Sequence, residues 1–213
     1  MDGGTYLVPG YYAPVHRSLS EPILLGGAPR AVAILNGTLA GALGLGEVGR
    51  EVAGRAKAMG MHILYHQRRQ LPPEVEAQWN AEYVSFDDLF ARADFVSIHV
   101  PLNDATRGMV DAAAFARMKD GAILINASRA HIVDRDALIG ALNSGRLGGA
   151  GLDTFSEEPA DPTLPVYQLP NVYATPHVAG VTDGSTRKRA VFAADNLDCF
   201  ARGEPVRGRV EGR

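Results

Sequence analysis

The segment Gly44-Leu45-Gly46-Glu47-Val48-Gly49 constrains this chain more than any other stretch. With 24 glycines among 213 residues, a G-x-G-x-x-G pattern carries little information by itself. Its surroundings carry more, because residues 39–43 are typical of a short buried strand and residues 48–59 of a helix with small and apolar residues on one face. A strand, a glycine turn and a helix in this order predict a dinucleotide site.

Each glycine of the turn has its own expected role. Gly44 permits the tight turn, Gly46 lets the backbone approach a pyrophosphate, and Gly49 lets the helix pack on the strand. The phosphates would then lie at the helix N-terminus, where free N–H groups and the helix dipole favour negative charge. The alternative is a glycine-rich turn that only packs a helix.

The rest of the chain alternates between short apolar runs and helical stretches, which is typical of βαβ units. Further strands are expected at residues 61–65, 82–84, 95–100, 122–126, 149–153 and 172–175. Helices are expected at residues 71–79, 85–91, 111–118, 134–144 and 185–201. We therefore expect an α/β fold with a doubly wound parallel sheet of the Rossmann type, whose ligands bind beyond the carboxyl ends of the strands.

Three segments follow from this pattern: an irregular proline- and glycine-rich arm (1–37), a dinucleotide-binding Rossmann domain (38–184), and a C-terminal helix and tail (185–213).

The net charge of -3 and a pI near 6.1 argue against a nucleic acid partner. The most apolar stretch, residues 31–46, is too short and too interrupted for a membrane span, and the single cysteine, Cys199, suits a reducing compartment. These features predict a cytoplasmic protein.

Three polar residues follow the ends of neighbouring predicted strands and should face one crevice: Arg129, Glu158 and His177. An arginine can hold a substrate carboxylate with two hydrogen bonds, a histidine can exchange a proton with a carbonyl or hydroxyl, and a glutamate can orient that histidine. Taken singly, each residue has an ordinary explanation as a helix cap, a solvated side chain or part of a turn. Together they predict a hydride-transfer site.

Five motifs in this order closely resemble the D-isomer-specific 2-hydroxyacid dehydrogenase family. They are the glycine turn at residues 44–49, His99-Val100-Pro101-Leu102, Ile125-Asn126-Ala127-Ser128-Arg129, Gly151-Leu152-Asp153-Thr154-Phe155 with Glu158-Pro159, and Thr175-Pro176-His177-Val178-Ala179-Gly180.

The resemblance implies an oxidoreductase that moves hydride between NAD(P)H and a small 2-keto or 2-hydroxy acid, similar to glyoxylate/hydroxypyruvate reductases. It implies that Arg129 binds the substrate carboxylate and carbonyl, that His177 is the acid/base, and that Glu158 is its partner. It also implies a cofactor site made of Gly44, Gly46, Glu47, Val48, Gly49, Val100, Pro101, Ala127, Asp153, His177 and Gly180. Formate dehydrogenases of the family are similar over residues 71–75 but carry Gln in place of Glu158, so formate ranks below a keto acid.

Several positions depart from the pattern of the family. The acidic residue that usually ends the second strand is replaced by Gln67, followed by Arg68, which favours NADP over NAD. Ala130 replaces a glycine that usually follows the arginine, which would strain the backbone if positive φ is needed there. His99 is expected to bond backbone near the cofactor.

Only residues 1–37 precede the first strand, where family members have a substrate domain, so that domain is expected to be largely missing. The alternative function is therefore a catalytically weak NAD(P)-binding module, a truncated relative that acts in cofactor sensing or interaction. A homodimer through the cofactor domain is implied by the resemblance. No metal site is expected, because His62 and His66 fall on a predicted strand and at its end, and not on a helix, where residues four apart share one face.

Overall fold

The computed structural model describes residues 39–208, so the predicted N-terminal arm lies outside the described residues. The chain divides into two compact units, one that ends at Pro176 and one that begins at His177, and each is considered by itself. The boundary at residues 184/185 that the sequence suggests between the Rossmann domain and the C-terminal helix stays a prediction.

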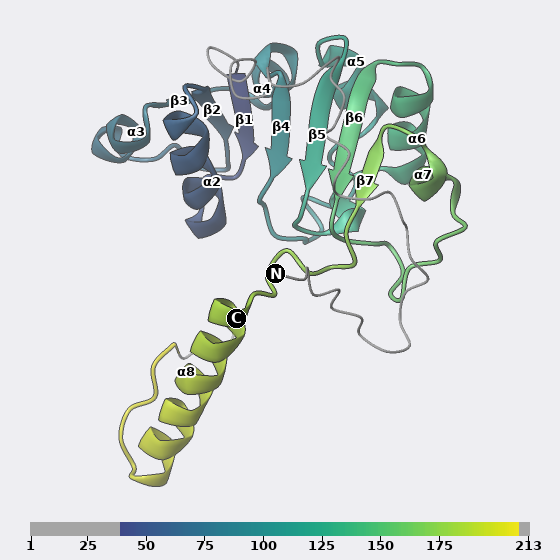
Figure 1. Ribbon diagram of the computed structural model, residues 1–213. Helices are drawn as coiled ribbons and strands as arrows, with labels where there is room; N and C mark the ends of the chain where they lie inside the picture. Colours follow the sequence, from purple (N-terminus) through teal and green to yellow (C-terminus); the bar gives the residue numbers. More distant parts are fainter. Residues whose placement is uncertain (1–38, 209–213) are drawn as a thin grey trace, which may run out of the picture. The chain divides into compact units, whose positions relative to one another are not determined.

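The first unit is built on a parallel sheet of seven strands in the order β3-β2-β1-β4-β5-β6-β7 (Figure 1). The strands are β1 (Leu39–Leu43), β2 (His62–His66), β3 (Ala81–Tyr83), β4 (Phe95–Ile98), β5 (Ala122–Asn126), β6 (Leu147–Leu152) and β7 (Val172–Ala174). Every predicted strand is present, with ends displaced by at most two residues. The predicted Rossmann-type sheet is confirmed.

Helices connect the strands, and short polar side chains start several of them. The elements are α2 (Glu47–Ala58), α3 (Pro73–Trp79), α4 (Phe86–Arg92), α5 (Ala112–Arg117), the 3-10 helix η1 (Ala130–Ile132), α6 (Arg135–Asn143) and α7 (Pro165–Gln168). Ser85, Asp111 and Asp134 each accept a hydrogen bond from the backbone N–H three residues ahead, which satisfies one free donor at the start of α4, α5 and α6. The sequence pattern does not predict η1 and α7, because three or four residues are too few to show a helical period.

The alternation of side chains along β1 and β2 explains why helices cover both faces of the sheet. Leu43 and Leu64 belong to a large apolar cluster that also holds buried residues of α4, α5 and α6. Their neighbours Ala42 and Ile63 point to the opposite face and pack with Ala53 of α2. Two separate apolar layers on one parallel sheet define a doubly wound fold.

The strand register aligns the carboxyl ends of six strands in one row across the sheet. Leu43 pairs with His66 and with Ile98, Ile98 pairs with Asn126, and Asn126 pairs with Leu152, which in turn pairs with Ala174. The loops after β2, β1, β4, β5, β6 and β7 therefore begin at the same level, in that order. This row positions the candidate site.

The second unit is the helix α8 (Asp183–Ala201) with its flanking segments. Thr182 and Ser185 form a complete capping box at its N-terminus, and the end of the helix is closed by Gly203, which has a φ of 70°. After that turn, Arg207 returns to the helix, where it pairs with Asp195 at 2.7 Å. None of the helices within residues 39–208 combines the length and apolar character needed to span a membrane.

Candidate functional site

The three glycines of the first turn lie in three different environments. Gly44 has a φ of 96°, and a Cβ there would lie 3.1 Å from backbone atoms of His99. A Cβ on Gly49 would collide with the backbone oxygen of Gly44, so only glycine lets α2 approach β1 this closely. A Cβ on Gly46 would meet nothing within 4 Å. The first and third glycines thus serve the fold, and the second borders open space.

The open space adjoins the N-terminus of α2. Gly46, Glu47 and Val48 are exposed, whereas Leu45 and Gly49 are buried. The helical hydrogen bonds start with the N–H of Arg50, which donates to the Gly46 carbonyl at 2.9 Å, and no side chain caps this end. The earlier amides therefore have no intrahelical acceptor. The exposed start of this 12-residue helix, whose first N–H groups no side chain caps within the described residues, fits a pyrophosphate.

Gln67 ties the end of β2 to this glycine turn. Its side-chain oxygen accepts the N–H of Leu45 at 3.0 Å, and its amide nitrogen donates to the Arg69 carbonyl at 2.8 Å. The carbonyl of His66 accepts the Gly44 N–H at 2.8 Å, which adds a backbone link beside the side-chain one. The next residue, Arg68, is exposed and forms no side-chain hydrogen bond or ion pair within the described residues. Its guanidinium is available to a ligand at this edge.

The loop after β5 is held rigid by residues that sequence reasoning did not single out. The Asn126 side chain accepts the Ser128 N–H at 3.1 Å and donates to the Arg129 carbonyl at 3.0 Å. The Ser128 hydroxyl donates to the Val100 carbonyl at 2.6 Å and so joins the loop to the segment after β4. Asparagine directly at a strand end, followed by serine, is the signal that could have revealed this clamp. Ala127, between them, is exposed.

Arg129 and Ala130 follow this clamp. The Arg129 side chain is exposed, and within residues 39–208 its guanidinium donates to the carbonyl of the preceding Ser128, at 2.7 Å, and to no other group. Ala130 starts η1 and is not among the residues with positive φ. The expected strain at this alanine is therefore absent. The arginine remains on an exposed loop whose backbone is fixed.

Asp153 is buried at the end of β6. It is 5% exposed, and its carboxylate accepts the hydroxyl of Thr175 at 2.6 Å, while its N–H donates to the Asn126 carbonyl at 3.0 Å. The ends of β5, β6 and β7 are thereby connected at a single residue, through the backbone N–H and the carboxylate of Asp153. Sequence reasoning placed Asp153 here but missed Thr175 as its partner.

Glu158, His177 and Gly180 complete the predicted set. Glu158 is exposed and lies between β6 and α7 in the first unit. His177 and Gly180 are also exposed and belong to the second unit, which His177 opens. His177 has a φ of 53°, a left-handed conformation that is uncommon for residues other than glycine. The common crevice of Arg129, Glu158 and His177 stays a prediction.

His99 lies behind the glycine turn, at the end of β4. Its backbone N–H donates to the Leu43 carbonyl at 2.8 Å, but its ring Nε2 is buried with no hydrogen-bond partner in residues 39–208. His99 thus bonds backbone through its main chain, as expected, while Nε2 of its ring has no partner in the described residues. Burial lowers the pKa of His99, because the charged imidazolium would lose its hydration. The lowered pKa favours the uncharged form of the ring, which lies next to Gly49.

Candidate metal ligands do not gather in the described part of the chain: no group of three or more His, Cys, Asp or Glu side chains lies close enough to hold an ion. The site consists of the exposed helix start, the loop of Arg129 and the fixed carboxylate of Asp153, all at one edge of the sheet.

Comparisons with known proteins agree with this geometry. Residues 27–179 match the family described as "D-isomer specific 2-hydroxyacid dehydrogenase, NAD binding domain". The chain is 42% identical to a glyoxylate reductase of Aeropyrum pernix over 80% of this chain and 50% of that protein. It is 44% identical to glyoxylate/hydroxypyruvate reductase B of Klebsiella pneumoniae over 74% of this chain and 49% of that protein.

Solved structures give the same result. A D-lactate dehydrogenase with NAD+ from Lactobacillus jensenii is 35% identical, with a TM-score of 0.75 over 82% of this chain and 56% of that one. The chain spans about half the length of the curated relatives that it matches.

Proposed function

The chain belongs to the D-isomer-specific 2-hydroxyacid dehydrogenase family, and on this basis we propose that it acts as an NAD(P)-dependent reductase of small 2-keto acids. The observation that carries the proposal is the row of strand ends. The first residues after this row include Gln67, Gly44, Ala127 and Asp153, which the family resemblance and strand pattern select as cofactor-binding. Glyoxylate and hydroxypyruvate are the proposed substrates, because relatives with 42% and 44% identity are named for them.

We propose that the dinucleotide lies along the carboxyl edge of the sheet. The free amides at Gly46, Glu47 and Val48 would hold its pyrophosphate. Val100, Pro101, Ala127, Asp153 and Gly180 would line its nicotinamide half. A bound nicotinamide supplies the hydride that a keto acid accepts.

The matched family domain is a NAD-binding domain, and we propose NADP as the preferred form in this chain. The support is the uncharged Gln67, which leaves no carboxylate to repel a 2′-phosphate, with Arg68 exposed beside it. NAD is the alternative.

The proposed roles of the catalytic residues follow from their chemistry. Arg129 holds the substrate carboxylate with its planar guanidinium. Because the backbone of its loop is already fixed, little conformational entropy of the loop is lost when the substrate binds. His177 gives a proton to the carbonyl oxygen as reduction proceeds, and Glu158 orients its ring. Glu158, rather than the Gln of formate dehydrogenases, supports a keto acid over formate. The left-handed backbone at His177 is consistent with a functional position, since such conformations cluster at active sites.

The second candidate function is dinucleotide binding without turnover, in sensing or interaction. It is favoured by the matched length, because half of each curated relative has no counterpart in the matched region.

We further propose a homodimer and a cytoplasmic location; a reducing compartment suits Cys199, the free cysteine of the described residues.

The experiment that tests the proposal is a pair of titrations followed by a turnover assay. The purified chain is titrated with NADPH and with NADH, and binding is followed by nucleotide fluorescence. Oxidation of the tighter nucleotide is then measured with glyoxylate and hydroxypyruvate. Turnover that is lost in His177→Ala while nucleotide binding is retained supports the reductase. Tight binding without turnover supports the second candidate, and absence of binding contradicts both.

A further inference from the structure

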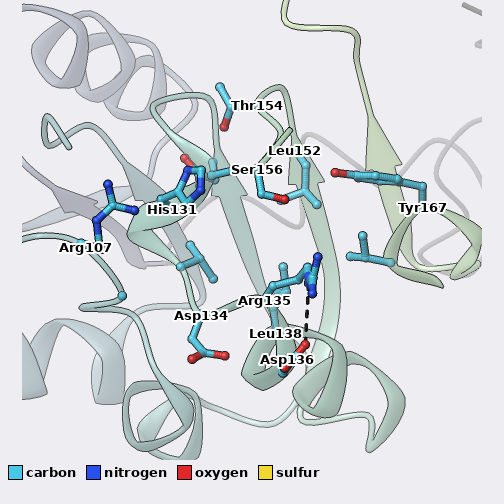
Figure 2. A pocket seen from close by; sticks show the side chains of 15 residues that line it. Arg107, His131, Asp134, Arg135, Asp136, Leu138, Leu152, Thr154, Ser156 and Tyr167 are labelled. Carbon is cyan, nitrogen blue, oxygen red and sulfur yellow. Dashed lines mark ion pairs between the residues drawn. The ribbon is translucent and has the colours of Figure 1, made fainter. Parts of the chain in front are cut away.

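A cavity of about 310 Å³ opens at the carboxyl ends of β5 and β6, on the side of α6 and α7 (Figure 2). Ala130 lines it, whereas the preceding Arg129 does not. Its volume is at the lower end of the range of small-molecule sites. The cavity therefore lacks the arginine proposed to hold the substrate, although it shares the loop that carries Arg129.

The floor of the cavity is apolar. Val133, Leu138, Leu152 and Val166 line it, and all four are buried. They come from the end of η1, from α6, from β6 and from α7. A floor of four branched aliphatic side chains favours a ligand with a short aliphatic body.

The rim carries charged groups of both signs. Asp134 uses its carboxylate to cap α6, and Asp136 lies 3.7 Å from the guanidinium of Arg135. Arg107 lines the same cavity, and its guanidinium has no hydrogen bond or ion pair within residues 39–208. His131 adds a further ring nitrogen on this side (Figure 2). The arrangement leaves an unpaired guanidinium above an apolar floor.

A buried hydroxyl points into the same space. Thr154 is 4% exposed, and its Oγ1 has no hydrogen-bond partner in the described part of the chain. Figure 2 shows this hydroxyl turned toward the hollow between His131 and Ser156. A buried hydroxyl without a partner lowers stability, and a ligand atom that bonds to it would remove this cost.

The phenol of Tyr167 supplies another donor. Burial raises the pKa of Tyr167, so its hydroxyl keeps its proton, although the charge of Arg135 acts in the opposite direction. The ring is fixed edge-on against Phe155, with 5.2 Å between ring centroids. Arg107, Thr154 and Tyr167 therefore offer donors to a ligand, beside the carboxylates of Asp134 and Asp136.

We propose that this cavity binds a small monocarboxylate with a short branched aliphatic body. The carboxylate accepts hydrogen bonds from Arg107 and Thr154, and the body lies on the floor formed by Val133, Leu138, Leu152 and Val166. A phosphate fits less well, because it has no apolar part for that floor and its second charge would meet Asp134 and Asp136 on the rim.

The test is an NMR titration of the full chain with isovalerate and, in parallel, with its neutral isostere isovaleramide. Isovalerate is expected to shift the amide signals of Ala130, His131 and Thr154 saturably, and isovaleramide is expected to bind far more weakly. Arg107→Gln should weaken isovalerate binding about tenfold, the usual size of one lost charge-assisted hydrogen bond. Arg117→Gln, which removes an exposed arginine that lines no part of the cavity, is the matched control and should change nothing.

Two further variants keep the test independent of folding defects. Thr154→Val removes the buried hydroxyl and should weaken isovalerate binding while the protein stays folded. Asp136→Asn removes a rim carboxylate and should strengthen binding severalfold. Equal binding of the amide, equal effects of Arg107→Gln and Arg117→Gln, or shifts confined to the glycine turn and Arg129 would each overturn the proposal. Nucleotide binding is measured separately, so a failure here leaves the reductase proposal untouched.

Discussion

The side-chain oxygen of Gln67 accepts a 3.0 Å hydrogen bond from the backbone N–H of Leu45. This bond joins the end of β2 to the glycine turn after β1. The residue proposed to select the cofactor therefore also holds the loop that would bind its phosphates. A substitution at Gln67 reports on cofactor choice only if it preserves the acceptor.

Gln67→Glu should shift cofactor preference toward NADH. Glutamate has the same length and keeps an acceptor for Leu45, but its negative charge repels a 2′-phosphate. The ratio of NADPH to NADH affinity should fall by about tenfold or more, as expected for one added charge near a phosphate. Fluorescence titrations with both nucleotides measure this ratio. Gln67→Met is the control, because it removes the acceptor without adding charge and should weaken both nucleotides alike. An unchanged ratio in Gln67→Glu would contradict the role of this position.

Two alanine substitutions in the glycine turn should have different effects. Gly49→Ala places a Cβ against the Gly44 carbonyl and should lower the free energy of unfolding by about 1–3 kcal/mol, as overpacking does. Gly46→Ala meets no atom within 4 Å, so thermal stability should hold while nucleotide affinity falls. Thermal denaturation and nucleotide titration separate the two. Loss of stability in Gly46→Ala would show that its environment is misjudged.

Glu47→Gln should tighten nucleotide binding. Glu47 is exposed in the first turn of α2. Its carboxylate interacts favourably with the helix dipole there but would repel a bound pyrophosphate. Removing that charge should improve affinity about two- to fivefold at low salt, with the gain shrinking as salt rises. Glu51→Gln, one turn along α2, is the matched control, because Glu51 pairs with Arg55 at 2.7 Å. Equal gains in both variants would indicate a general charge effect rather than a local one.

His99 should make stability depend on pH. Because burial lowers its folded-state pKa below the ordinary value of 6.5, the unfolded chain binds its proton more readily. Stability from the neutral ring is present above pH 6.5 and is lost as the pH falls toward the folded-state pKa. Urea midpoints measured between about pH 7 and pH 5 should fall less in His99→Gln than in the unsubstituted chain. His131→Gln, an exposed histidine, should retain the full dependence.

The sequence predicted the sheet well and the site only in part. The strands could be predicted because a buried parallel strand such as residues 122–126 is a continuous apolar run between polar loops. Three features could not be predicted, because each depends on which loops become neighbours. They are the clamp of Asn126 and Ser128, the bond of Thr175 to Asp153, and the unpartnered Nε2 of His99. The order of the strands in the sheet decides which loops lie next to each other, and no local sequence pattern predicts that order.

The level row of strand ends has a consequence for how such a chain can change over evolutionary time. Because the register joins Leu43, Ile98, Asn126 and Leu152 at one height, each loop leaves the sheet from the same level. Insertions beyond the row leave the sheet intact, whereas a one-residue deletion inside a strand would turn its side chains to the opposite face. Exchange of a whole loop, as in a chimaera built with a relative, should therefore leave the strands in register.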